Sequence, residues 1–78
     1  MMHDVVRRPL SCVLPGSTVR LRGIRAGREL ATRLSAMGFV PGEMLHVQCN
    51  ARSGPLVVAV KGCRMILGRG MADKIAVE

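Results

Sequence analysis

The sequence is poor in aromatic rings, with one phenylalanine, Phe39, and neither tryptophan nor tyrosine. Proteins that hold single-stranded nucleic acids commonly stack the bases on aromatic side chains, each stack contributing about 1–3 kcal/mol. Proline-rich peptides also dock in grooves lined by aromatic residues. A single ring cannot build either site, so the composition leaves only weak, salt-sensitive phosphate contacts as a mode of nucleic-acid binding.

Long hydrophobic runs are also lacking. The longest unbroken aliphatic run, Leu56 to Val60, is far shorter than the roughly 20 residues that a membrane-spanning helix needs. The N-terminus has no apolar stretch of the kind that marks a secretory signal. The odd count of three cysteines, without a C-x-x-C pair, fits a reducing compartment. We therefore expect a soluble cytoplasmic protein whose membrane contact is only indirect.

Acidic residues are few: five stand against ten arginines and two lysines, giving a formal net charge of +7. Such an excess favours an acidic partner, and three kinds qualify on charge alone. These are nucleic acid, an acidic protein surface and the anionic leaflet of a membrane. Charge does not choose among them.

Catalytic motifs are missing from the sequence. It contains no G-x-S-x-G, no phosphate-binding P-loop, no H-E-x-x-H and no close pair of acids. The stretch Gly68-Arg69-Gly70 resembles part of a dinucleotide loop, but the third glycine and the βαβ context are absent, which favours a turn. We expect no enzyme activity and no cofactor.

A dedicated metal site is not predicted either. If residues 52–54 form a hairpin loop, Cys49 lies opposite residue 57, which leaves Cys63 about 20 Å away at the rise of a strand. Cys49 alternates with Leu45 and Val47, so we expect its thiol in the core. The residues that could bind a metal are Cys12, Cys49, Cys63, His3 and His46. The remaining way for the protein to bind an ion is incidental capture by His3 or His46 between two copies of the protein.

The hydrophobic pattern predicts a mainly β fold: a small barrel of about five strands with one short inserted α-helix over about residues 28–37. Alternation over residues 17–25 indicates a strand, with a bulge at Gly23 where the phase changes. Further strands are expected at residues 45–49, 56–61, 64–67 and 75–77, and the strand 56–61 is expected to be covered on both faces. Residues 1–9 are expected to be a flexible tail, and residues 10–78 a single domain.

The predicted helix is amphipathic. Leu30, Leu34 and Met37 recur at helical spacing and are expected to hold it against the strands. Gly38 is placed to take the left-handed conformation that ends a helix, and Phe39 would then fold back over the last turn.

Several blocks of the sequence resemble one known family. They are Leu10-x-x-x-Leu14-Pro15-Gly16, Leu34-x-x-Met37-Gly38-Phe39-x-Pro41-Gly42, Pro55-Leu56-Val57-Val58-Ala59-Val60-x-Gly62 and Leu67-Gly68-Arg69-Gly70-Met71-Ala72-x-Lys74-Ile75-x-Val77. Over residues 10–78 the chain resembles the FeoA family of ferrous iron transport accessory proteins. The segment Ile66-Leu67-Gly68 and Met71 depart from the Ala-Leu-Arg and acidic residues that many members have there.

The resemblance implies a Src-homology-3-like (SH3-like) domain in the cytoplasm that is not an enzyme. Its implied partner is FeoB, a membrane ferrous iron transporter with a cytoplasmic GTP-binding domain, which it would bind and modulate. A similar barrel forms the C-terminal domain of iron-dependent DtxR-type repressors. A basic nucleic-acid-binding or repressor-associated barrel is therefore the alternative, although no helix-turn-helix segment precedes the domain in this sequence.

Partner-binding residues are expected on a basic face and an apolar patch. The basic candidates are Arg20 and Arg22 on the first predicted strand and Arg28 and Arg33 on the helix, although a solvated rim would carry the same charges. A barrel this small cannot enclose both faces of every strand, so apolar surface is expected to remain uncovered at Met44, Met71, Val57, Ala59 and Ile66. Methionines adapt well to binding surfaces, so Met44 and Met71 are the apolar candidates, with self-association as a further use of such a patch.

Overall fold

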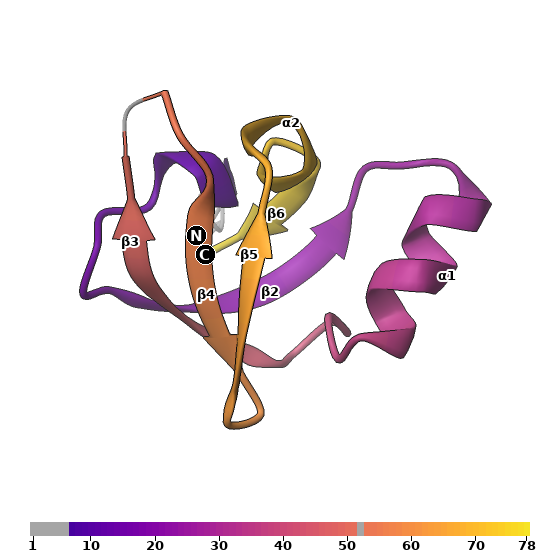
Figure 1. The fold of residues 1–78 in the computed structure, drawn as a ribbon. Coiled ribbons are helices and arrows are strands. Elements are labelled where there is room, and N and C mark those ends of the chain that lie inside the picture. The colour runs from indigo at the N-terminus through magenta and orange to yellow at the C-terminus, as the bar shows by residue number, and fades with distance from the viewer. Residues whose placement is uncertain (1–6, 52) are drawn as a thin grey trace, which may run out of the picture.

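The structure is a computed structural model that describes residues 7–51 and 53–78. Its strands form one antiparallel sheet in the order β1-β6-β2-β3-β4-β5. Figure 1 shows the sheet curled on itself, with the longer helix to one side of it. The elements in chain order are β1 (Arg8–Pro9), η1 (Leu10–Cys12), β2 (Thr18–Ile24), α1 (Arg28–Ala36), β3 (Met44–Asn50), β4 (Leu56–Val60), β5 (Cys63–Leu67), α2 (Arg69–Ala72) and β6 (Ile75–Val77). The prediction of a mainly β domain with one inserted helix is confirmed, with six strands instead of about five.

The additional strand is β1, which lies within the expected tail. Arg8 pairs with Val77 and Pro9 pairs with Ala76 of β6. The ordered sheet therefore begins before Leu10, and the expectation that residues 8 and 9 are unstructured is wrong. Two residues are too few to show a periodicity, and their partner strand lies at the other end of the chain. Residues 1–6 of the expected tail lie outside the described residues.

The core lies inside the curled sheet and is aliphatic except for one ring. Each of the longer strands sends alternate side chains into it, as the period of two requires. Ile24, Leu30, Met65 and Met71 pack against it while partly exposed. The buried hydrophobic residues are Leu10, Val13, Val19, Leu21, Leu34, Phe39, Leu45, Val47, Leu56, Val58, Val60, Leu67, Ala72, Ile75, Ala76 and Val77.

Strand β2 contains the predicted bulge. Leu21 pairs with Val77 and Gly23 with Ala76, so Arg22 is an extra residue that has no partner position on β6. The bulge restores the phase of the strand, because Ile24 on its far side packs against the core. The change of phase in the sequence was therefore a correct signal.

Strand β3 contains a second bulge, which the sequence did not predict. Val47 pairs with Val58 and Cys49 with Val57, which leaves Gln48 as the extra residue. The alternation reverses beyond that point, so Cys49 is exposed. The expectation of a buried Cys49 is wrong for this reason, although its predicted place opposite residue 57 is confirmed. No glycine marks this bulge.

Strand β4 is hydrogen-bonded on both sides, by β3 and by β5. Leu56, Val58 and Val60 are buried, whereas Val57 and Ala59 are only half-buried. The expectation that both faces are fully covered is therefore wrong. The strand is internal within the sheet, but one of its faces is partly open to solvent.

Helix α1 ends as the sequence predicts. Its last residue is Ala36, and Gly38 has a φ of +103°, in the left-handed region. The N–H of Gly38 donates to the carbonyl of Ser35 at 3.0 Å, and that of Phe39 donates to the carbonyl of Leu34 at 2.9 Å. These two bonds form a Schellman motif. Phe39 follows directly after the helix and is fully buried in the same core cluster as Leu34 of the last turn.

Candidate docking cleft

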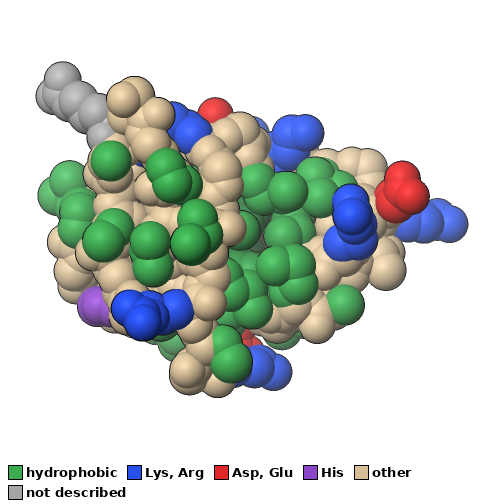
Figure 2. All heavy atoms as spheres, viewed as in Figure 1, with side chains coloured by type: hydrophobic (Ala, Val, Ile, Leu, Met, Phe, Trp, Pro, Cys, Tyr) green, Lys and Arg blue, Asp and Glu red, His purple; other side chains and the backbone are tan. Residues whose placement is uncertain are grey.

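A cleft of about 270 Å³ lies between α1 and β5. Figure 2 shows hydrophobic side chains lining a hollow between the sheet and the helix, with lysine and arginine groups around it. Ile66 and Met37 are the most exposed of the apolar residues along it, at 73% and 43%. The full lining is Leu30, Arg33, Leu34, Met37, Ile66, Leu67, Gly68 and Met71.

The cleft exists because α1 stands away from the sheet. Leu34 is the only residue of the helix that is buried, and Leu30 is partly exposed. The sequence predicts that Met37 holds the helix against the strands, but this residue is 43% exposed. The helix is therefore anchored near its C-terminal end, by Leu34 and by the buried Phe39 that follows it. Leu30 and Met37, together with Leu34, form the apolar part of the helix wall of the cleft.

Basic side chains border this apolar surface. Arg33 lines the cleft and also lies on the outer face of the helix beside Arg28. Glu29 is the acidic residue of the first turn. Within residues 7–51 and 53–78, the ion pairs are Arg22 with Glu78 and Lys61 with Glu43, so neither Arg28 nor Arg33 is neutralised by an ion pair of that part of the chain. The border of the cleft suits an acidic partner.

The six predicted partner-binding residues fall into separate places. Met71 and Arg33 lie together in the cleft, and Arg28 lies next to Arg33. Arg20 and Met44 are cross-strand neighbours on β2 and β3, away from the residues that line the cleft. The sixth, Arg22, is held in its ion pair with Glu78.

Several residues of the cleft were missed as binding candidates. Leu30 and Met37 were assigned to the attachment of the helix, because helical periodicity predicts which face is apolar but not how closely it packs. Ile66, in contrast, is among the apolar residues that the sequence predicts to remain uncovered, and its exposure of 73% agrees with that prediction. The same signal, a surplus of apolar residues over what so small a core can enclose, could also have indicated Leu30 and Met37.

A polar network fixes α2 beside this cleft. Arg69 donates to the carbonyls of Ser11 and Ala51 and to the side-chain oxygen of Asn50. Asn50 in turn donates to the carbonyls of Ser11 at 3.0 Å and Val13 at 2.7 Å. Both terminal nitrogens of the Arg69 guanidinium thus donate to protein oxygens, whereas its Nε is buried without a partner among the described residues. The role of Arg69 is structural, and Gly68-Arg69-Gly70 forms the beginning of the one-turn helix α2, not a phosphate loop.

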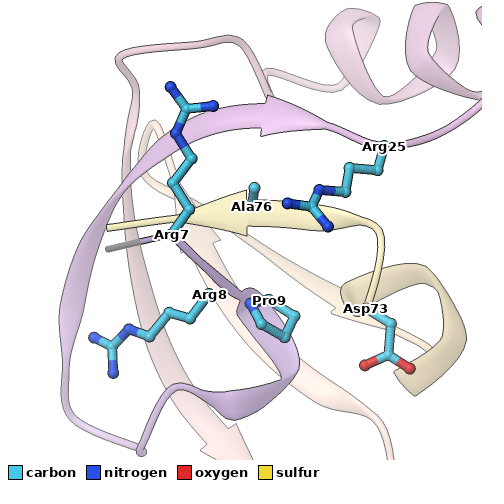
Figure 3. A pocket seen from close by; sticks show the side chains of 6 residues that line it. All are labelled: Arg7, Arg8, Pro9, Arg25, Asp73 and Ala76. Carbon is cyan, nitrogen blue, oxygen red and sulfur yellow. The ribbon is translucent and has the colours of Figure 1, made fainter. Parts of the chain in front are cut away.

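A second, smaller hollow of about 110 Å³ lies over β1 and β6. Figure 3 shows that the side chains of Arg7, Arg8 and Arg25 around it point in different directions. The carboxylate of Asp73 accepts a hydrogen bond from the Ser11 hydroxyl. The arginines do not converge on a single point, so this basic surface lacks the geometry of a site for one small anion.

The residues that could bind a metal are dispersed. No group of three or more His, Cys, Asp or Glu side chains lies close enough to hold an ion within the described residues. Cys12, Cys49 and Cys63 are all exposed and unpaired. His46 shares a hydrogen bond of 2.8 Å with the Thr18 hydroxyl, and His3 lies outside the described residues.

An antiparallel sheet curled around an aliphatic core, with one helix inserted after its second strand, places the chain among small SH3-like domains. Comparison with known proteins then gives the family. The FeoA domain model matches residues 8–78. The chain belongs to the FeoA domain family, and its relatives carry names from ferrous iron transport.

Three relatives illustrate the match. A protein of Methanocaldococcus jannaschii named "Putative Fe(2+) transport protein A" is 39% identical over 70 residues, covering 90% of this chain and 84% of the relative. The crystal structure of an iron uptake regulatory protein (FeoA) has a TM-score of 0.87 at 30% identity, covering 94% and 97% of the two chains. FeoA of Stenotrophomonas maltophilia, solved with zinc and described as an SH3 domain protein, has a TM-score of 0.79 at 25% identity, covering 90% and 88%.

Metal-dependent repressors share the fold. The IdeR protein of T. acidophilum has a TM-score of 0.80 at 22% identity, and the match covers 99% of this chain but 36% of IdeR. At that identity the likeness concerns the fold alone. The helices of the described residues are too short or too polar to span a bilayer.

Proposed function

We propose that this chain is a non-catalytic accessory protein of ferrous iron uptake, which docks on the cytoplasmic GTP-binding domain of a FeoB-like transporter and modulates it. Membership of the FeoA family and the relative named for Fe(2+) transport support the pathway. Docking is supported by one structural observation in particular: the apolar cleft between α1 and β5, with arginine at its border.

The cleft suits protein recognition better than it suits chemistry. Exposed aliphatic and methionine side chains gain free energy by leaving water, at roughly 25 cal/mol for each Å² that is buried. They offer no group that could act as an acid, base or nucleophile. Arg33 adds a charge that can select an acidic partner and speed its association. Action in the cytoplasm follows from this proposal, since the implied partner domain lies there.

Charge reversal at the cleft tests the proposal. Ile66→Glu should weaken binding to the purified GTP-binding domain by at least about tenfold, because it puts a charge into an apolar contact. Leu14→Glu is the matched control, since Leu14 is exposed to 72% and Ile66 to 73%, and Leu14 does not line the cleft. Isothermal titration calorimetry measures both affinities. Absence of binding by the unchanged chain, or an equal loss in both variants, contradicts docking through the cleft.

The alternative, a basic nucleic-acid-binding or repressor-associated barrel, is supported by the net charge of +7 and by the fold shared with repressors. The burial of Phe39 counts against it, because the ring has no exposed face on which a base could stack. Fluorescence anisotropy with labelled oligonucleotides over a salt series separates the two functions. Micromolar binding that survives 200 mM salt, a severe condition for phosphate contacts, would favour the alternative.

A further inference from the structure

Strand β5 is the last strand of the sheet, paired with β4 on one side only. A strand in this position presents a row of unpaired backbone groups that can pair with another chain. Proteins commonly cover such an edge, twist it away or charge it. Here the edge has one arginine, Arg64, followed two positions later by the exposed Ile66.

The hairpin geometry identifies which backbone groups are free. Lys61 and Gly62 both have positive φ, 51° and 79°, so β4 and β5 are joined by a two-residue type I′ turn. In such a hairpin the residues flanking the turn, Val60 and Cys63, form a hydrogen-bonded pair. The bonded pairs then recur at every second residue.

Arg64 and Ile66 therefore belong to the non-hydrogen-bonded pairs. Their N–H and C=O groups point away from β4, towards the open side of the sheet. Within the described residues, no backbone hydrogen bond from another segment reaches either of them. Two donors and two acceptors are thus directed outwards along one edge.

The docking cleft lies along this edge. Its lining combines Ile66, Leu67 and Gly68 from β5 and its end with residues of α1 on the opposite wall. Figure 1 shows α1 on the side of β5 that faces away from β4, and Figure 2 shows hydrophobic side chains in the hollow between the sheet and the helix. A strand added to β5 would lie in this space and alternate its side chains between the cleft and the outer face of the sheet.

We propose that the occupant of the cleft is an extended segment of the partner protein that adds to β5 as a further strand, with aliphatic residues at every second position and acidic residues between them. The aliphatic side chains enter the cleft beside Leu34 and Met71. The acidic side chains lie on the outer face, which Arg64 shares with Ile66 two positions along the strand, and they are attracted to Arg64 as cross-strand neighbours of opposite charge. The backbone provides affinity, and the alternation provides specificity. This inference rests on the proposed docking function and states how the partner is held.

A second copy of the chain is a poorer occupant. Each copy has a net charge of +7, and pairing two β5 edges brings two Arg64 side chains to the same outer face. Like charges on neighbouring strands are unfavourable. The basic border selects a segment of opposite charge.

The test uses proline, which removes one backbone N–H. Proline is tolerated in an edge strand where the lost N–H faces solvent, so Ile66→Pro should keep the fold and remove one donor from the free edge. Ile66→Ala is the matched control, because it loses the side chain but keeps the donor. With the purified GTP-binding domain as the probe, Ile66→Pro should bind at least about tenfold more weakly than Ile66→Ala. Equal affinities of the two variants would overturn strand addition while leaving the docking function intact.

A second arm decides the inference if the GTP-binding domain does not bind at all, an outcome that would refute the proposed function. The probe is then a synthetic peptide of alternating leucine and glutamate, with a peptide of equal composition but separate leucine and glutamate blocks as its control. Only the alternating peptide should slow amide hydrogen exchange at Arg64 and Ile66. Unchanged exchange at both amides overturns the inference. Slowed exchange that depends on protein concentration without peptide also overturns it, because it assigns the edge to a second copy.

Discussion

The guanidinium of Arg22 forms an ion pair with the carboxylate of Glu78, with the Arg22 nitrogen 2.8 Å from the Glu78 oxygen. Arg22 is the extra residue of the β2 bulge, so it interrupts the regular alternation of side chains between the two faces of the strand. The backbone of Glu78 also exchanges two hydrogen bonds with Arg20, at 3.0 and 3.1 Å. The bulge thus helps to attach Glu78, the last residue of the sequence, to strand β2.

Removing this ion pair should cost little. Both side chains are about a third exposed or less, and such pairs contribute up to about 1 kcal/mol. Glu78→Gln should therefore lower the free energy of unfolding by up to about 1 kcal/mol in urea titrations at low salt, and by less at high salt. The control is a double-mutant cycle: in the Arg22→Gln background, Glu78→Gln should show no such loss. A salt-independent effect at Glu78 would contradict an ionic origin.

Replacement of Gly38, which ends α1, should destabilise the fold. Its φ of +103° strains any other residue, and Gly38→Ala should cost about 1–2 kcal/mol of stability. An added Cβ would meet only ordinary contacts, 3.8 Å from Val60 and 3.9 Å from Lys61, so the cost comes from the backbone. Gly70→Ala in α2 is the control, because it meets nothing within 4 Å and has a helical backbone. Chemical denaturation should find the control unchanged or more stable.

Asn50 should contribute more to stability than its partly exposed position in β3 suggests. Its amide satisfies the carbonyls of Ser11 and Val13, and its oxygen accepts from Arg69. Asn50→Leu leaves these groups unpaired and should cost about 1–3 kcal/mol. Gln48→Leu, at the exposed bulge position of the same strand, should cost less than half of that. Thermal and urea unfolding compare the two variants, and equal losses would mean that the network has no special role.

The two sides of β5 should respond differently to proline. Met65 lies opposite Val58 in a hydrogen-bonded pair, so Met65→Pro removes a ladder bond and should cost about 1–3 kcal/mol. Ile66→Pro removes an N–H that points away from β4 and should cost clearly less. Urea denaturation of the two variants, each compared with its alanine variant, measures the difference. A larger loss at Ile66 would reverse the assigned orientation of the strand.

The bulge in β3 makes a chemical prediction. Because it turns Cys49 outwards, the native protein should expose all three of its thiols. Titration with Ellman's reagent under native conditions should therefore modify three thiols in one fast phase. Cys49→Ser should reduce this phase by one thiol without unfolding the protein. A thiol that reacts only after denaturation would place Cys49 in the core.

Local signals in the sequence predicted the local features of the fold. The helix, its end at Gly38 and the bulge beside Gly23 each have a residue that marks them. The bulge at Gln48 has no such mark, because a residue of ordinary backbone conformation can take that position. Strand β1 escaped prediction because its only support is pairing with β6, a non-local contact that no short-range pattern reports.

The cleft could be predicted only in part. The sequence gives Met71 and Arg33 as partner-binding candidates, and both line the cleft. It also suggested Arg20 and Met44, which pair with each other elsewhere on the sheet. Which apolar residues remain exposed depends on how far α1 stands from β5. That distance is set by packing in three dimensions, where Leu34 reaches the core and Met37 does not.

The pairing of Arg8 with Val77 brings the beginning and the end of the folded unit side by side. A polypeptide joined to either end would leave from the same corner of the domain, at the opposite end of the strand order from β5. Such a unit can be appended to, or inserted into, a longer chain with little disturbance. This property explains in physical terms how the same architecture can make up about a third of the length of IdeR.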